Sequence, residues 1–70
     1  MKDSGVNELV GIRERLAAFD RAITAAELAT LLAVQPDMLY KLARKGSIPH
    51  IRIGTAVRFD PARIADWIEV

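Results

Sequence analysis

The 70-residue sequence contains no cysteine and only one histidine. Without cysteine the chain can form neither a disulfide framework nor a thiolate metal site, and no other metal motif is present, so we expect no metal and no cofactor. The acidic residues are scattered, and no spacing pairs a nucleophile with a base, so we do not expect an enzyme. Complete disorder is also excluded, because 51% of the residues are hydrophobic.

Long apolar runs are missing as well. No run approaches the roughly 18 residues that a membrane-spanning helix needs. The first residues, MKDSGVNE, are polar and mixed in charge, unlike a signal peptide. We therefore expect a cytoplasmic protein with no membrane partner. Seventy residues allow one small domain with a modest core.

Positive charge is concentrated in one stretch of the chain. Residues 38–59 contain five basic and no acidic side chains, whereas the remaining residues contain five basic and nine acidic ones. The formal net charge of +1 therefore conceals a basic segment beside an acidic remainder. A surface of this kind attracts a polyanion such as nucleic acid.

The N-terminal part carries an apolar stripe with spacings of three and four residues, which predicts a helix. We assign residues 1–22 to this helix and residues 23–70 to the domain that follows. The stripe either packs on the domain's own core or forms the seam of a homodimer, and about two heptads are too few to decide between them. The residues of the homodimer seam would be Leu9, Ile12, Leu16 and Phe19.

The next helix has the clearest start in the chain. Thr24 and Glu27 have the spacing of a capping box, in which each side chain accepts a hydrogen bond from the backbone of the other residue. Ile23 and Leu28 flank this cap as a hydrophobic staple. The helix should end near Ala33, shortly before Pro36.

Pro36 suits the first turn of a second helix, and Gly46 suits its left-handed end, so this helix should span residues 36–45. The short connection between the two helices makes them a helix-turn-helix. The exposed face of the second helix should carry the hydroxyl of Tyr40 at its edge and a strip of cations: Lys41, Arg44 and Lys45.

Residues 50–59 change to a period of two, which predicts a β-hairpin. A three-residue loop at residues 54–56 would place every apolar side chain on one face and set Arg52 opposite Arg58 on the wet face. A two-residue loop would put Arg58 opposite Ile51, on the core side, and is rejected on that ground. The two opposed arginines would repel each other unless an external anion lay over them, and two solvated arginines are the alternative.

Asp60 and Pro61 form a cap and a first-turn proline, which predict a last helix. Its apolar face should consist of Ile64, Trp67 and Ile68, with Trp67 in the core.

This order of helix, turn, helix, two-stranded hairpin and helix resembles the winged helix-turn-helix domains of the excisionase and MerR-like type. The resemblance covers about residues 23–68. It implies a mainly α fold with a small β-hairpin wing, to which this chain adds an N-terminal helix. The segments that carry it are TAAELATLLAV at 24–34, LYKLARKGSIP at 39–49, IRIGTAVRF at 51–59 and RIADWI at 63–68.

Members of that family bind double-stranded DNA, with the second helix of the pair in the major groove and the hairpin as a wing over the backbone. The resemblance therefore implies a recognition helix at residues 36–45 and a wing at residues 50–59. The implied DNA contacts are Gln35, Asp37, Tyr40, Lys41, Arg44, Lys45, His50, Arg52, Thr55 and Arg58.

Many family members are accessory proteins of phages, plasmids or transposons that act with a recombinase, and others regulate transcription. A recombinase or integrase is therefore an implied second partner, and the nucleoid is the implied location. The chain departs from the family pattern at Gln35, where serine is usual, and at residues 36–38, where polar or basic residues are usual. Two alternatives remain: a protein-interaction module on the same fold with weakened DNA binding, and the DNA-binding domain of a packaging subunit.

Overall fold

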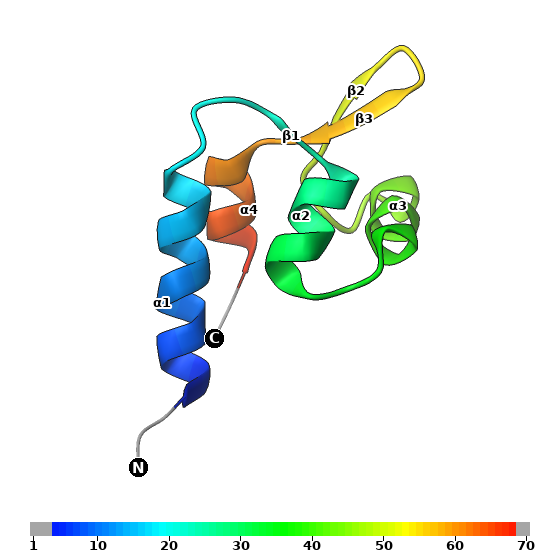
Figure 1. Cartoon of the computed structure of the whole chain (residues 1–70). Coiled ribbons are helices and arrows are strands. Elements are labelled where there is room, and N and C mark those ends of the chain that lie inside the picture. Colours follow the sequence, from blue (N-terminus) through cyan, green and yellow to red (C-terminus); the bar gives the residue numbers. More distant parts are fainter. Residues whose placement is uncertain (1–3, 69–70) are drawn as a thin grey trace.

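The computed structural model describes the backbone of residues 4–68 and the side chains of residues 11–68. Within this part of the chain there are four helices and a three-stranded antiparallel sheet, whose β2–β3 hairpin projects away from the helices (Figure 1). This arrangement confirms the winged helix-turn-helix prediction. The elements are α1 (Ser4–Ala17), β1 (Ile23–Thr24), α2 (Ala25–Leu32), α3 (Pro36–Lys45), β2 (Ile51–Ile53), β3 (Ala56–Phe59) and α4 (Pro61–Trp67).

Helix α2 begins at the predicted capping box. The Thr24 hydroxyl accepts a hydrogen bond from the Glu27 amide at 3.1 Å, and the Glu27 carboxylate accepts one from the Thr24 amide at 2.9 Å. The helix ends at Ala33, which adopts the left-handed conformation with φ 58°. Both predicted ends of this helix are therefore confirmed. The start depends on side chains of the right type, Thr24 and Glu27, whereas the end at Ala33 is closed by backbone hydrogen bonds alone.

Helix α3 also has its predicted ends. Pro36 occupies the first turn, and Gly46 ends the helix in the left-handed region with φ 73°. The amide of Ser47 donates to the carbonyl of Leu42 at 2.8 Å, which closes the last turn. This closure directs the chain back toward the core, where Ile48 is buried.

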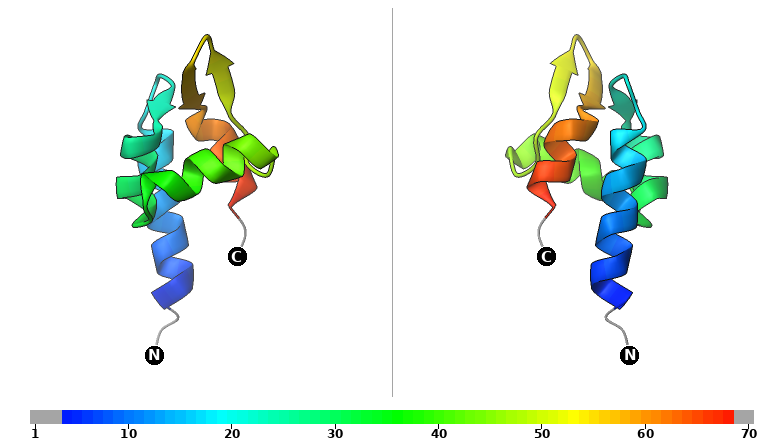
Figure 2. Two further views of the ribbon diagram at one scale, coloured as in Figure 1. Left: turned by 90° about the vertical axis from the view of Figure 1, so that its right-hand side faces the viewer. Right: turned by 90° about the vertical axis from the view of Figure 1, so that its left-hand side faces the viewer.

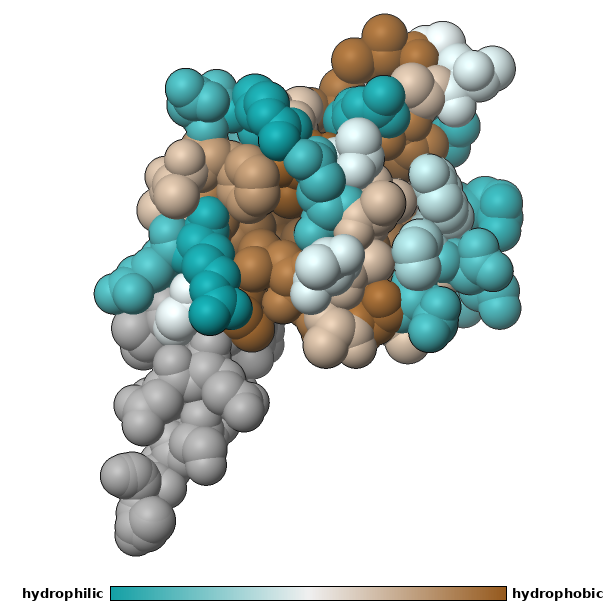
Figure 3. Space-filling model, viewed as in Figure 1, coloured by the Kyte–Doolittle hydropathy of each residue, from teal (hydrophilic) through white to brown (hydrophobic). Residues whose placement is uncertain are grey.

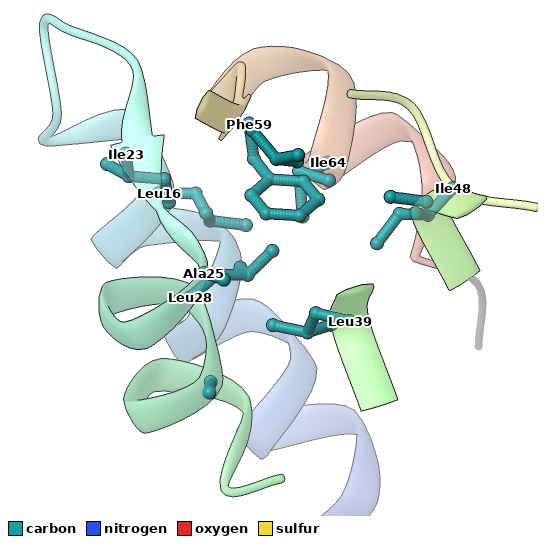
Figure 4. Close-up of a cluster of buried hydrophobic side chains, with 11 residues drawn as sticks. Leu16, Ile23, Ala25, Leu28, Leu39, Ile48, Phe59 and Ile64 are labelled. Atoms are coloured by element: carbon teal, nitrogen blue, oxygen red, sulfur yellow. The ribbon is translucent and has the colours of Figure 1, made fainter. Parts of the chain in front are cut away.

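The core lies where α1, α2, α3, α4 and the base of the sheet meet. Phe59 is fully buried, and Figure 4 shows its ring among Leu16, Ile64 and Leu39. Burial of large apolar side chains such as these stabilises the fold by about 1.5–3 kcal/mol per side chain. The largest fully buried side chains are Phe59, Leu16, Ile23, Leu28, Leu39 and Ile64.

Helix α1 packs along α4, as Figures 1 and 2 show. Leu16 is only 1% exposed, and Ile12 and Phe19 are half-buried against the same core. The guanidinium of Arg13 adds a hydrogen bond of 2.7 Å to the carbonyl of Ile68, beyond the end of α4. Leu16 therefore packs on the domain's own core, which is one of the two alternatives predicted for the stripe, and its side chain is not available for a homodimer seam. The side chain of Leu9 lies outside the described residues.

The sheet departs from the predicted register. Ile53 pairs with Ala56, Arg52 with Val57, and Ile51 with Arg58, so the loop holds only residues 54 and 55. Gly54 adopts φ 60° at the first loop position, where a tight type II′ turn requires glycine. The three-residue loop was the wrong prediction, and the rejected two-residue loop is the one that forms.

The shift by one residue changes which side chains share a face. Val57 and Phe59 point into the core, as predicted, but the strand opposite them brings Arg52 to that face. Ile51 and Ile53 lie on the outer face with Arg58, where they are 40% and 63% exposed. Apolar and polar residues do alternate along the wing, as predicted. The wing extends beyond the core, however, so Ile51 and Ile53 did not have to be buried.

Strand β1 is a further element that the sequence analysis missed. Ile23 pairs with Phe59, and Thr24 with Arg58, which makes β3 the central strand of the sheet. A two-residue strand carries too little alternation to be recognised in a sequence.

Trp67 was predicted to lie in the core, but it is only half-buried and packs against the edge of the core. Its indole N–H donates a hydrogen bond of 3.0 Å to the carbonyl of Ser47. This bond ties the end of α4 to the turn after α3, so the side chain holds two elements together at the surface.

The pKa of Glu27 predicts an acid dependence of folding. Hydrogen bonds from Arg21 and from the Thr24 backbone lower this pKa to about 2. A carboxylate with a depressed pKa in the folded state stabilises the fold above its unfolded pKa and loses this effect as the pH falls through the folded pKa. We expect the difference in unfolding free energy between the parent and Glu27→Gln to shrink from about pH 4.5 to about pH 2, measured by urea titrations. Parallel profiles for the two proteins would contradict this account.

Candidate nucleic-acid interface

The exposed face of α3 carries the predicted basic strip. Leu39 and Ala43 are buried on the inner face of α3. Residues 41, 44 and 45 have the spacing of three and four that puts side chains on one face of a helix, and this face points away from the core into solvent. The basic side chains there are Lys41, Arg44 and Lys45, all exposed. Figure 3 shows hydrophilic side chains gathered on the side of the molecule where α3 lies.

None of these cations forms an ion pair with a carboxylate among the described side chains. The only ion pair within 4.0 Å in that part of the chain joins Arg21 to Glu27, at the start of α2. The strip on α3 is therefore not neutralised from within this part of the chain. Unpaired cations on one helix face are suited to bind an external anion, and their attraction to it falls with salt.

The first turn of α3 is also open to solvent. Gln35 precedes the helix and makes no capping hydrogen bond, so its side-chain amide is available for a ligand. Asp37 and Tyr40 are exposed near it. The turn therefore presents one amide, one carboxylate and one phenol beside the basic strip.

Met38 is a residue that the predicted contacts omit. Its side chain is 50% exposed and shares the outer face of α3 with Lys41, three residues later. The exposure of Met38 could have been predicted from the sequence, because position 38 lies three residues before Lys41 and therefore on the same helix face as the basic strip.

The wing rises above α3, and the two elements lie on the same side of the molecule (Figure 2, left). Arg52 projects from the face of the wing that also carries Val57 and Phe59, and therefore toward the side of the helices. Arg58 projects from the outer face, is half-buried, and donates a hydrogen bond of 2.9 Å to the carbonyl of Val57. The predicted pair of opposed arginines does not form, so no anion can lie over both of them on one face.

The remaining two predicted contacts differ in their settings. His50 is half-buried, and its Nδ1 lies 2.9 Å from the carbonyl oxygen of Ile48. This contact requires the proton on Nδ1, since a carbonyl oxygen can only accept, and it leaves Nε2 for another partner. Thr55 is exposed at the tip of the wing.

In the described part of the chain, no three histidine or acidic side chains lie close enough together to hold a metal ion. No helix of that part is both long and apolar enough to cross a lipid bilayer. What the surface offers is positive charge, hydrogen-bond donors and a few exposed apolar groups.

Comparison with known proteins gives results that agree with the helix-turn-helix seen in the structure. A family model described as a helix-turn-helix domain matches residues 22–69. Two proteins from two strains of Mycobacterium tuberculosis, each named "Putative DNA-binding protein", are 30% identical over 59 residues, which cover 84% of this chain and 76% of each relative. No solved structure gives a significant match.

Proposed function

The chain belongs to a family of excisionase-like helix-turn-helix DNA-binding domains, and from this premise we propose that it binds duplex DNA with α3 in the major groove and the wing over the adjacent backbone. Two observations carry the proposal: the exposed basic strip of α3 forms no ion pair with the described side chains, and the wing lies on the same side of the molecule as α3 (Figure 2). With its side chains an α-helix is about 10–12 Å in diameter, which fits a major groove about 12 Å wide.

The cations supply most of the affinity in this proposal. Lys41, Arg44 and Lys45 reach phosphates on both sides of the major groove, and Arg52 reaches the backbone next to the wing. Contacts to phosphate fix the position of the protein on the duplex but do not read the sequence. Each neutralised phosphate releases counterions, so the affinity falls as salt rises.

The first turn of α3 reads the bases. The free amide of Gln35 can pair with adenine, and the carboxylate of Asp37 can accept a hydrogen bond from the amino group of cytosine. The exposed side chain of Met38 can pack on the methyl group of thymine. Asp37 also repels phosphate, so a site without a suitably placed cytosine is disfavoured.

The biological role that fits this binding mode is that of an accessory factor in recombination of mobile DNA or in transcription regulation. One small domain covers few base pairs, so high specificity requires repeated sites or a neighbouring protein such as a recombinase. The buried position of Leu16 argues against a second copy docked on that side chain.

The salt dependence of DNA binding can show that Arg52 contacts phosphate and that Arg58 does not. Four phosphate contacts predict a slope of log affinity against log salt of about −3.6. Arg52→Ala should reduce the magnitude of this slope by about 0.9, since one contact is lost. Arg58→Ala should leave the slope unchanged, because its side chain is bound to the Val57 carbonyl on the other face of the wing.

Fluorescence anisotropy with a labelled duplex at several salt concentrations measures these slopes. An equal reduction by both variants would place Arg58 on the DNA and contradict the face assignment. The absence of any binding to duplex DNA at low salt would contradict the proposed function itself.

The base preference of Asp37 can be tested by selecting bound duplexes from a random library. We expect the parent to select cytosine at one position, and substitution of that base to cost about 1–3 kcal/mol. Asp37→Ala should lose the preference there and bind random duplex more tightly, because a negative charge near phosphate has been removed. Tyr40→Phe is a matched control on the same turn and should keep the cytosine. An identical selected site for parent and Asp37→Ala would show that this carboxylate reads no base.

A further inference from the structure

The tip of the wing exposes an apolar side chain that the fold does not use. Ile53 is 63% exposed and is the last residue of β2 before the loop. Gly54, Thr55 and Ala56 follow it, so the tip is narrow and Ile53 is its one large side chain. Figure 3 shows a hydrophobic patch at the end of the molecule that the wing occupies.

We propose that Ile53 is a wedge that enters the minor groove of the bound duplex and inserts between two neighbouring base pairs. This inference rests on the proposed function, because it names how the wing of a DNA-bound chain meets the groove beside α3. Aliphatic side chains at a projecting tip are able to unstack a base step in this way, and burial of the side chain offsets part of the unstacking.

The tip of the wing, and not the whole ribbon, is narrow enough for the minor groove. The axes of two paired strands lie about 4.8 Å apart, so the ribbon with its side chains is wider than the minor groove of B-form DNA, which is about 6 Å wide. At the tip, glycine, threonine and alanine add little width to the backbone. Only Ile53 is long enough to reach past the groove walls into the stack.

The charges around the tip favour DNA over a protein as the occupant. Residues 38–59 contain no acidic side chain, so nothing on the wing repels phosphate. Arg52 neighbours Ile53 but projects from the opposite face of the strand, where it can neutralise the backbone at one wall of the groove. The wing is also on the same side as the basic strip of α3 (Figure 2), so one duplex can contact both.

Ile51 provides a matched control within the same strand. It lies on the same outer face as Ile53 but at the base of the wing, and it is 40% exposed. There it lines a hollow together with Asp60 and Arg63, near the start of α4. It is therefore an isoleucine of the same strand and face that cannot reach the groove when the tip does.

The test uses the full chain and a duplex carrying its selected site, with 2-aminopurine placed at successive positions beside the major-groove contacts. This base analogue becomes more fluorescent when it is unstacked. The parent should raise the fluorescence severalfold at one step. Ile53→Ala should abolish that rise and weaken binding roughly tenfold, because truncation removes most of the buried apolar area. Ile53→Leu should preserve both, and Ile51→Ala should behave as the parent.

Two results would overturn the wedge while leaving the proposed function in place: a parent that binds the site without unstacking any base, or an Ile53→Ala variant that binds and unstacks as the parent does. A loss of affinity in Ile53→Ala without a change in fluorescence would also overturn it and would assign the tip to a DNA contact that unstacks no base. Failure of the parent to bind any duplex would instead refute the proposed function. Because Ile53 is exposed, thermal unfolding of its variants should match the parent and confirm that they are folded.

Discussion

Packing around Phe59 determines how the two binding elements are placed relative to each other. Phe59 is the last residue of β3, the central strand of the sheet, and its side chain is fully buried at the base of the wing. It lies among Leu16, Leu39 and Ile64, which come from α1, α3 and α4 (Figure 4). The direction of the wing and the orientation of α3 are therefore set by one set of apolar contacts. A close-packed core resists small shifts, so these contacts hold the wing and α3 in a defined geometry.

Two surface hydrogen bonds reinforce this arrangement from outside. Trp67 binds the carbonyl of Ser47 and so holds the chain between α3 and β2 against the end of α4. Arg13 binds the carbonyl of Ile68 and holds α1 against the same end. Helix α4 is thus the support on which both the N-terminal helix and the segment leading into the wing rest. Within the described residues, the basic strip of α3 forms no ion pair, which keeps its cations available for a ligand.

In the candidate site, charged side chains would provide affinity for DNA, and other groups would distinguish one sequence from another. Positive charge lies on α3 and on Arg52, and it acts over distance without distinguishing sequences. The groups that can distinguish sequences are few and lie in the first turn of α3, where Gln35, Asp37 and Met38 are exposed. The apolar tip of the wing adds a third means of recognition, which depends on how easily a base step is deformed.

The sequence by itself determined the ends of α2 and α3, the basic strip and the helix-turn-helix, but not the end of α1, which lies at Ala17 and not at residue 22 as predicted. Each depends on neighbours within one or two turns: the Thr24 capping box, Pro36 at the start of α3 and Gly46 at its end. Tertiary structure alone decided the register of the wing, the burial of Leu16 and the separation of Arg52 from Arg58. Alternation along a strand shows that two faces differ, but it cannot show where the core ends. The wing projects past that limit, so its isoleucines stay in solvent and its loop closes on two residues around Gly54.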